Sequence, residues 1–317
     1  MDVTYNSPSM PGIEGSPSSY DYLFSPTSIG YGAKERENSE LSGQLKGSRL
    51  WFKTRRKTEI GLVQSLIEAD FGGSTGNEKT VNSHNIRMRH AYMKIDNLTI
   101  GQSNSLFMGR GNADTVVGGV DMVLVRQPLI HYKSDLLGFK YGVGLESAES
   151  TVSVQGVSKT FDDDRRVDIS AFIAHKSINS EIALAWLNRE LRANQVDENQ
   201  TFAKTSNNFH LSGRYRAFGR DSIRFSLIHG SGVGRYMALN YYTAGVLDNN
   251  GVYHSRELLA YHVAYQHFWS KTLRSSLLYS KVNAQTFSED SQKLAKVSNS
   301  IHLNLRYSPF KNGLFRA

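Results

Sequence analysis

Residues 86–96 read Ile-Arg-Met-Arg-His-Ala-Tyr-Met-Lys-Ile-Asp, and residues 98–102 read Leu-Thr-Ile-Gly-Gln. Apolar and polar side chains alternate in both stretches, and successive side chains of a β-strand point to opposite faces of its sheet. The two stretches therefore predict two strands that meet at a tight Asp96-Asn97 turn. One face of the first strand is cationic and the other is mostly apolar. The cationic face carries Arg87 and Arg89, and the apolar face carries Ile86, Met88 and Tyr92.

A strand with one charged face and one apolar face is typical of a membrane β-barrel, whose lumen is polar and whose outside contacts lipid. A Gly-rich segment at residues 103–121 comes next, and a third strand begins at Val125-Arg126-Gln127-Pro128. The segment is long enough to fold into a barrel, and Leu106, Phe107 and Met108 would anchor it. We expect it to form a constriction loop. Its residues expected near the basic wall are Asn104, Arg110 and Asp114.

The rest of the chain also alternates between apolar and polar residues, in segments joined by long polar loops and short turns in strict succession. Residues 6–47 read as a long irregular first loop, and residues 192–206 as another loop. Long loops on one side and short turns on the other are typical of bacterial outer-membrane barrels. The predicted short turns are at residues 55–57, 96–97, 134–138, 177–180, 219–221, 269–271 and 308–313.

We therefore expect residues 1–317 to form a single all-β domain, an antiparallel transmembrane β-barrel of about 16 strands. The loops would be extracellular and the turns periplasmic. The first and last strands are expected to be truncated. A soluble sandwich would also alternate but would not keep its loops on one side, and a propeller would show repeats that this sequence lacks.

Composition narrows the class of protein. The chain has no Cys, which excludes a disulfide framework. No apolar run approaches the length of a membrane-spanning helix. The formal net charge is +8, which favours anionic partners. Because no basic run exceeds Arg55-Arg56-Lys57, a nucleic-acid-binding arm is disfavoured.

No catalytic or metal-binding constellation stands out in the sequence. The His residues lack the spacing of metal ligands. The glycine-rich run at residues 230–234 lacks the Gly-Lys-Ser/Thr ending of a phosphate loop. Residues 162–164 are three Asp in a row, which reads as a solvated loop rather than a cation site. We expect no catalytic residue, no metal, no cofactor and no enzymatic activity.

The basic residues are the set that is most informative about function. If the apolar faces contact lipid, the basic side chains point into the lumen, because Lys or Arg on the lipid face at mid-membrane costs roughly 2–4 kcal/mol. An Arg-lined aqueous tube would concentrate anions. The alternative is that these residues only pair with acids and stiffen the wall. The expected pore-lining cations are Arg49, Lys53, Arg87, Arg89, Arg126, Arg214, Arg216, Arg224, Arg274 and Arg306, and the expected lumen acids are Glu68, Asp70 and Glu146.

Several blocks resemble the DcaP-like outer-membrane porins. They are Ser48-Arg49-Leu50-Trp51-Phe52-Lys53, Ile67-Glu68-Ala69-Asp70-Phe71, Ile86-Arg87-Met88-Arg89-His90-Ala91-Tyr92, Ile100-Gly101-Gln102-Ser103-Asn104-Ser105-Leu106-Phe107-Met108 and Val125-Arg126-Gln127-Pro128. Residues 1–5 resemble the end of the first strand of these porins. The matching blocks cover residues 48–134, and beyond them the resemblance is one of architecture.

The resemblance implies a trimeric porin of the Gram-negative outer membrane that passes small anions such as dicarboxylates and aromatic dicarboxylic acids. By position, Arg49, Arg87, Arg89 and Arg126 match its basic wall positions. The chain departs from the family after Met108, where Gly109-Arg110-Gly111 replaces an Asp and a Pro-containing stretch. This departure changes the charge of the expected constriction.

The expected partners are small anionic solutes, outer-membrane lipid and lipopolysaccharide, and further copies of the chain in a homotrimer, with no nucleic acid. Three alternatives remain open at this point. They are a barrel that serves adhesion or recognition through its surface loops, a barrel enzyme, and a soluble basic β-protein that binds nucleic acid.

Overall fold

The computed structural model describes residues 2–6, 40–73, 84–110, 120–161, 165–195, 200–290, 294–309 and 315–316. Most of the predicted first loop, Asp114 of the predicted constriction loop and the Asp run at 162–164 lie outside these ranges. The chain divides into two compact units. Unit 1 comprises Met1–Asn104 and Arg126–Ile130, and unit 2 comprises Ser105–Val125 and His131–Ala317.

Unit 1 is built of antiparallel strands. A small two-stranded sheet pairs β1 (Asp2–Asn6) with β2 (Glu40–Gln44), which lies in the segment predicted as irregular. Strands that are consecutive in sequence then pair in order. These strands are β3 (Arg49–Thr58), β4 (Gly61–Asp70), β5 (Arg87–Ile95), β6 (Leu98–Asn104) and the first residues of β7 (Arg126–Leu136).

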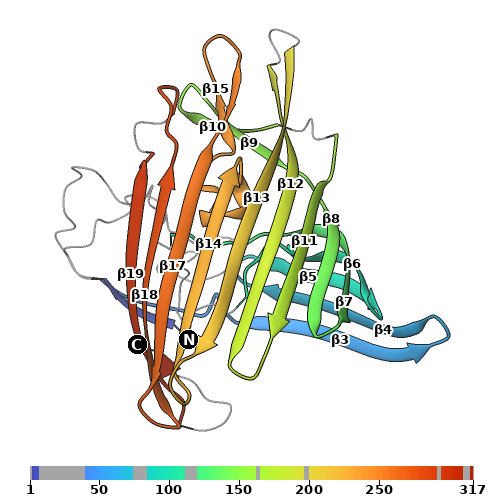
Figure 1. Cartoon of the computed structure of the whole chain (residues 1–317), viewed down its shortest axis with the longest axis vertical. Helices are drawn as coiled ribbons and strands as arrows, with labels where there is room; N and C mark the ends of the chain where they lie inside the picture. Colours follow the sequence, from blue (N-terminus) through green and yellow to red (C-terminus); the bar gives the residue numbers. More distant parts are fainter. Residues whose placement is uncertain are drawn as a thin grey trace. The chain divides into compact units, whose positions relative to one another are not determined.

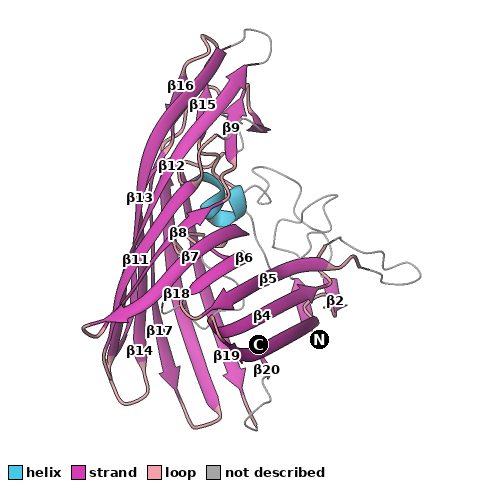
Figure 2. Cartoon of the chain, turned by 90° about the vertical axis from the view of Figure 1, so that its right-hand side faces the viewer, coloured by secondary structure: helices cyan, strands magenta, loops and turns pink. Residues whose placement is uncertain are grey.

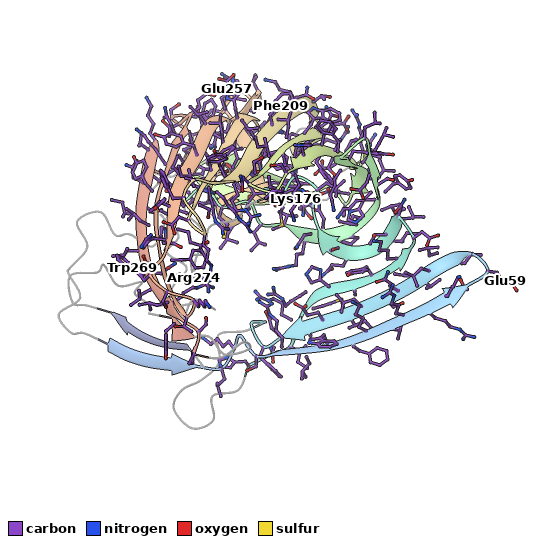
Figure 3. The ribbon with its side chains drawn as sticks, turned by 60° about the horizontal axis from the view of Figure 1, so that its bottom comes forward. Glu59, Lys176, Phe209, Glu257, Trp269 and Arg274 are labelled. Atoms are coloured by element: carbon purple, nitrogen blue, oxygen red, sulfur yellow. The ribbon has the colours of Figure 1, made fainter. Side chains whose placement is uncertain are left out.

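The turn between β3 and β4 differs from the prediction. Arg55, Arg56 and Lys57 continue β3 and pair with residues of β4, so the basic triplet is not a turn. The chain reverses instead at residues 59 and 60, between the end of β3 and the beginning of β4. Glu59 lies at the tip of the hairpin (Figure 3). Gly61 begins β4 with φ of 116°, a conformation that residues with a Cβ rarely adopt. The glycine, rather than the charges, therefore fixes the place of the reversal.

A β-bulge in β5 changes which residues share a face. Met88 pairs with Ala69 and His90 pairs with Glu68, which leaves Arg89 as an extra residue. The bulge moves Tyr92 onto the face of Glu68, so the prediction that Tyr92 shares the apolar face of Met88 is wrong. The predicted turn at residues 96–97 is confirmed, because β5 ends at residue 95 and β6 begins at residue 98.

Unit 2 continues with longer strands, and Figure 1 shows β11 to β14 and β17 to β19 side by side in chain order. Each pairs antiparallel with its neighbour in this order. The strands are the remainder of β7, β8 (Phe139–Glu146), β11 (Asp168–Lys176), β12 (Ser180–Gln195), β13 (Gln200–Arg216), β14 (Ser222–Ser231), β17 (Glu257–Phe268), β18 (Leu273–Ala284), β19 (Val297–Tyr307) and β20 (Phe315–Arg316).

The segments between these strands contain structure that the sequence did not predict. A four-stranded sheet joins β9 (Ser150–Val154), β10 (Val157–Phe161), β15 (Gly245–Leu247) and β16 (Tyr253–Ser255). Two 3₁₀ helices, η2 (Gly234–Tyr236) and η3 (Ala238–Asn240), lie on one side of the unit 2 strands (Figure 2). No helix in the described ranges has the length and apolarity needed to cross a membrane.

The observed short turns agree better with the predictions from the sequence than the observed loops do. Chain reversals fall between β11 and β12, β13 and β14, and β17 and β18, as predicted. The turn expected at residues 134–138 contracts to Leu137 and Gly138, which both have positive φ, as a two-residue hairpin of type I′ requires. The loop expected at residues 192–206 is also shorter, because β12 extends to Gln195 and β13 begins at Gln200.

The strands of unit 2 expose apolar side chains and bury polar ones. In β13, Phe209 and Leu211 are exposed, whereas His210 and Ser212 between them are 3% and 2% exposed. Exposed and buried positions also alternate along β14 and β17, where Leu227 and Leu259 are exposed and Ser226 and Gln266 are buried. A water-soluble protein shows the opposite arrangement, and a barrel wall in lipid requires this one. We call the two sides of the strands the apolar face and the polar face.

Candidate functional site

The polar face of unit 1 carries a cluster of charged residues that its strand register brings together. Arg49 on β3 pairs with Asp70 on β4, and Asp70 pairs with Arg87 on β5. Residues directly opposite each other on neighbouring strands have their Cβ atoms close together. One buried carboxylate therefore stands between two cations on three adjacent strands.

Hydrogen bonds hold this cluster in a fixed geometry. Arg87 donates from Nε and Nη2 to the two oxygens of Asp70, at 2.9 and 2.8 Å. Arg89 donates from Nε to Glu68 at 2.8 Å and from Nη1 to Asp70 at 2.8 Å. Arg49 Nη1 lies 3.8 Å from Glu68 Oε1. Bidentate pairing with carboxylates is the strong mode of guanidinium binding, so both acids are committed to arginines within unit 1.

Arg126 at the start of β7 adds a fourth guanidinium to the cluster. The charges of Arg89, Arg87 and Arg49 repel it, and that of Asp70 attracts it. Its Nε is buried and has no hydrogen-bond partner within the described part of the chain. Four guanidinium groups therefore face two carboxylates. We call Arg49, Arg87, Arg89, Arg126, Glu68 and Asp70 the arginine cluster.

The predicted constriction loop extends from unit 1 into unit 2. Asn104 ends β6, and its Oδ1 is buried without a hydrogen-bond partner among the described residues. Arg110 donates its backbone N–H to Ser212 Oγ at 2.9 Å, and its guanidinium lies over the ring of Phe172 and 4.0 Å from Glu181. Asp114 lies outside the described residues.

Within unit 2, the beginning of this loop is bound to the polar face of the strands. Phe107 is fully buried, and its carbonyl accepts a hydrogen bond from Nδ1 of His210 at 2.8 Å. Glu146 accepts from the hydroxyl of Ser105 at 3.0 Å and from the backbone N–H of Leu106 at 3.1 Å. The apolar anchor predicted from Leu106 and Phe107 therefore has a set of polar contacts beside it.

The end of the loop is bound to later strands of unit 2. The backbone N–H of Val120 donates to Ser280 Oγ at 2.8 Å. Nδ1 of His262 donates to Asp121 Oδ2 at 2.7 Å. Ser280 lies on β18 and His262 on β17, and β17 is separated by β14 from β13, which binds the beginning of the loop. The described ends of the loop thus contact different strands of the polar face of unit 2.

A second loop packs against the first, and sequence reasoning missed it. The backbone N–H groups of Leu124 and Ala238 donate to the carbonyls of Tyr236 and Met122. Tyr236 is fully buried, and its hydroxyl lies 3.1 Å from Glu146 Oε2 and 2.9 Å from Asp168 Oδ2. The segment from residue 232 to residue 240 therefore lies on the polar face together with the described ends of the predicted constriction loop.

A buried arginine supports this second loop. Arg189 is 1% exposed, binds Asp168 at 3.0 Å, and donates to the carbonyls of Gly232 and Val233. One signal in the sequence could have revealed the contact. Arg189 comes after Ala185 and Leu187 on the inward-facing positions of β12, and an arginine in such a row needs a buried partner.

The remaining predicted cations are distributed over several strands. Lys53 is exposed and stands apart from the arginine cluster on β3. Arg214 and Arg224 are directly opposite each other on β13 and β14, and Arg274 and Arg306 are opposite each other on β18 and β19. Arg216 is exposed near the end of β13. Within the described ranges, no group of His, Asp and Glu is arranged to hold a metal ion.

Comparisons with known proteins place this geometry in context. A family model described as DcaP outer membrane protein matches residues 27–313. The chain is similar to the outer membrane channel DcaP of Acinetobacter baumannii, with a TM-score of 0.72 and 19% sequence identity, covering 87% of this chain and 79% of that one. No curated protein sequence matches the chain.

Two further solved structures share the fold more distantly. The anion-selective porin from Comamonas acidovorans has a TM-score of 0.53 and 14% identity, with 86% and 78% of the two chains covered. The trimer form of in-vitro folded OmpT from Vibrio cholerae has a TM-score of 0.52 and 12% identity, with 86% and 78% covered. At these identities the similarity establishes the fold alone, and it confirms the antiparallel porin-type β-barrel predicted from the sequence.

Proposed function

The chain belongs to the DcaP outer membrane protein family and is a β-barrel channel of the Gram-negative outer membrane, and we propose that this channel is a diffusion pathway that favours small anions such as dicarboxylates. The observation that carries the proposal is the arginine cluster. It holds more guanidinium groups than carboxylates, and Arg126 has a buried Nε without a hydrogen-bond partner in the described residues.

The chemistry of the cluster suits a dicarboxylate. Arginine stays protonated at every physiological pH, and its planar fork matches a carboxylate. A hydrogen bond to a charged group contributes about 1.5–3 kcal/mol. Hydrogen bonds from the arginines to the two carboxylates of one solute therefore contribute only a few kcal/mol to its binding free energy. The cost of ordering the solute must be subtracted from this contribution. Such binding is weak enough for the solute to leave again, as conduction requires.

The alternative interpretation is that the arginines only stiffen the wall. It accounts for Arg87 and Arg89, which bind Asp70 and Glu68 directly. It does not account for Arg126, which stands among like charges. Three positive neighbours would make this position unfavourable unless an anion visits it. The placement of Arg126 thus favours permeation over a structural role.

We also propose that the loop at residues 103–121 narrows the pore. Its support is the contact of both described ends with the polar face of unit 2, through His210 at the beginning and His262 at the end. The chain is proposed to form a homotrimer, as the family resemblance implies and as the OmpT trimer does. Its proposed partners are small anionic solutes and the lipid and lipopolysaccharide of the outer membrane.

The test of the proposed function compares two substitutions of equal charge. Arg126→Gln removes the cation whose buried Nε has no partner among the described residues. Arg56→Gln is the control, because Arg56 lies on β3 with Arg49 of the cluster but pairs with Val63 on the apolar face. We expect Arg126→Gln to lower the chloride-to-potassium permeability ratio at least about twofold in a planar bilayer and to weaken block by added dicarboxylate. Equal ratios in the two variants would refute the role of the cluster.

A further inference from the structure

A histidine lies on the polar face of unit 1 because of the β-bulge in β5. His90 pairs with Glu68 on β4, and Arg89 is the extra residue that precedes it. With regular alternation, His90 would share the apolar face of Met88, which is two residues away. The bulge moves His90 to the face of Glu68 instead, and residues opposite each other on neighbouring strands have their Cβ atoms close together. The strand register therefore adds an imidazole to the arginine cluster.

Charged groups of four strands surround this imidazole within unit 1. Glu68 lies opposite it on β4, and Arg89 precedes it on β5. The charges of Arg126 on β7 and Arg49 on β3 also act on it. The three arginines oppose a positive charge on the ring, and Glu68 favours one. His90 therefore lies in the electrostatic field of the same cluster on which the proposed function rests.

The uncharged contacts of His90 are compatible with both protonation states of the ring. Its Nδ1 lies 3.4 Å from the hydroxyl oxygen of Ser103 on β6. A hydroxyl can donate to a neutral ring nitrogen or accept from a protonated one. The ring of Tyr92 stands edge-on to the imidazole, with the two centroids 6.3 Å apart. The side chain is only partly buried, so protons of the solvent can reach it.

We propose that His90 makes the anion preference of the channel depend on pH. The inference rests on the proposed function, which it deepens by naming a regulator of the same arginine cluster. Histidine has an ordinary pKa of about 6.5, and its charge therefore changes in a range in which arginine stays protonated. Protonation of His90 adds one positive charge to the cluster. Acidification therefore strengthens the attraction of the cluster for anions.

The coupling between the proton and the anion acts in both directions. If a proton on His90 strengthens anion binding, a bound anion must strengthen proton binding by the same factor. The physical reason is that an anion among the guanidinium groups offsets the repulsion that Arg126 exerts on a protonated ring. Because this interaction scales with charge, a dianion is coupled to the proton more strongly than a monoanion.

The experiment measures the chloride-to-potassium permeability ratio of the full chain in a planar bilayer, at about pH 7.5 and at about pH 4.5. Chloride is the probe because its own charge is the same at both pH values. The lower pH lies well below the ordinary pKa of histidine because the arginines oppose protonation. His90→Gln keeps the position neutral, and His90→Lys keeps it positive. The control is His175→Gln on β11 of unit 2, an exposed histidine whose ring lies 5.0 Å from that of Phe139.

We expect the ratio of the parent channel to rise at least about twofold on acidification, because one added charge changes the energies of chloride and potassium in opposite directions. His90→Gln should lose most of this rise. His90→Lys should keep a high ratio at both pH values, and His175→Gln should behave like the parent channel.

An equal rise in the parent channel and in His90→Gln would overturn the inference, because other titrating groups would then cause it. A rise in His90→Lys as large as that of the parent would overturn it as well, which keeps the test decisive where His90→Gln forms no channels. A parent channel that favours chloride equally at both pH values also overturns the inference but leaves the proposed function standing. A parent channel without chloride preference at either pH would refute the proposed function and this inference with it.

Discussion

At the scale of single residues, alternation predicts faces well until a local irregularity intervenes. The polar-face positions of Arg87, Glu68 and Asp70 result from the period of two. Tyr92 departs from it, because the extra residue Arg89 shifts the register by one. This bulge is a shift in strand pairing and not a change in the alternation of residue types, so nothing in the local sequence marks it. The same bulge allows Arg89 to reach both Glu68 and Asp70, which the sequence could not have indicated.

The first prediction at this scale concerns Asp70, which is 2% exposed and binds two arginines. Asp70→Asn removes the charge that compensates Arg87 and Arg89. Breaking a buried ion pair costs about 3–5 kcal/mol, because the remaining charge is left uncompensated. We expect a lower temperature of barrel unfolding, measured by loss of heat-modifiable migration. Glu59→Gln at the hairpin tip is the control, and an equal unfolding temperature for the two variants would contradict the role of Asp70.

A second residue-scale prediction concerns the end of the constriction loop. Asp121→Asn weakens the contact with His262, whose Nδ1 lies 2.7 Å from the carboxylate. We expect the loop to detach more often from the polar face, which would produce larger fluctuations of single-channel current. Asp135→Asn, which affects an exposed pair with Lys140, should leave the current noise unchanged. Quiet channels in the Asp121 variant would show that this contact does not hold the loop.

At the scale of elements, strands and short turns could be predicted and loop structure could not. The strands of unit 2 carry long alternating patterns, and Gly138 marks a tight turn. The β9–β10 hairpin does carry a local turn signal, at Gln155 and Gly156 with positive φ, which the prediction missed. The two 3₁₀ helices lack such a pattern, because their stability comes from contacts with strands distant in sequence. Tyr236 is an example, since its hydroxyl lies near Glu146 and Asp168. Contacts of this range carry no local signal.

The turn between β13 and β14 gives an element-scale prediction with a pH dependence. Burial raises the pKa of Asp221, but hydrogen bonds from Tyr265, the backbone of Phe268 and His267 outweigh it and hold the pKa below its ordinary value. A carboxyl whose pKa is lowered by folding stabilises the fold at every pH above its unfolded pKa, which is about 3.9 for Asp. This stabilisation is lost as the pH falls through the pKa of the folded state.

We therefore expect Asp221→Asn to lower the unfolding temperature at about pH 7 and to have a smaller effect as the pH approaches about 3. The measurement is thermal unfolding of the detergent-solubilised channel across this range, monitored by circular dichroism. Asp248→Asn, in the loop of unit 2 between β15 and β16, offers a comparison in which the lowered pKa belongs to a different element. A destabilisation by Asp221→Asn that is constant with pH would contradict the linkage.

At the scale of the whole molecule, charge placement matters more than net charge. The formal net charge of +8 would fit many basic proteins. The arginine cluster of unit 1 lies on a polar face, and so do Arg214, Arg224, Arg274 and Arg306 of unit 2. The apolar faces of the strands carry exposed Leu, Ile and Phe side chains. This separation was predictable from alternation. The pairing of individual arginines with acids required the strand register.

Screening by salt also acts at this scale. The Debye length is about 10 Å at 0.1 M salt and about 3 Å at 1 M. An anion preference that arises from guanidinium charge should therefore be stronger in dilute salt than in concentrated salt. A preference set by pore width alone would not depend on salt in this way.

The arginine cluster can be tested through the reversal potential of the unmodified channel in a planar bilayer, under a KCl gradient centred near about 0.1 M and again near about 1 M. We predict a reversal potential of the sign that chloride selectivity gives, with a smaller magnitude in concentrated salt because the charges are screened. A reversal potential near zero, or of the opposite sign, in open channels at low salt would contradict the proposal that the arginine cluster makes this pore favour anions.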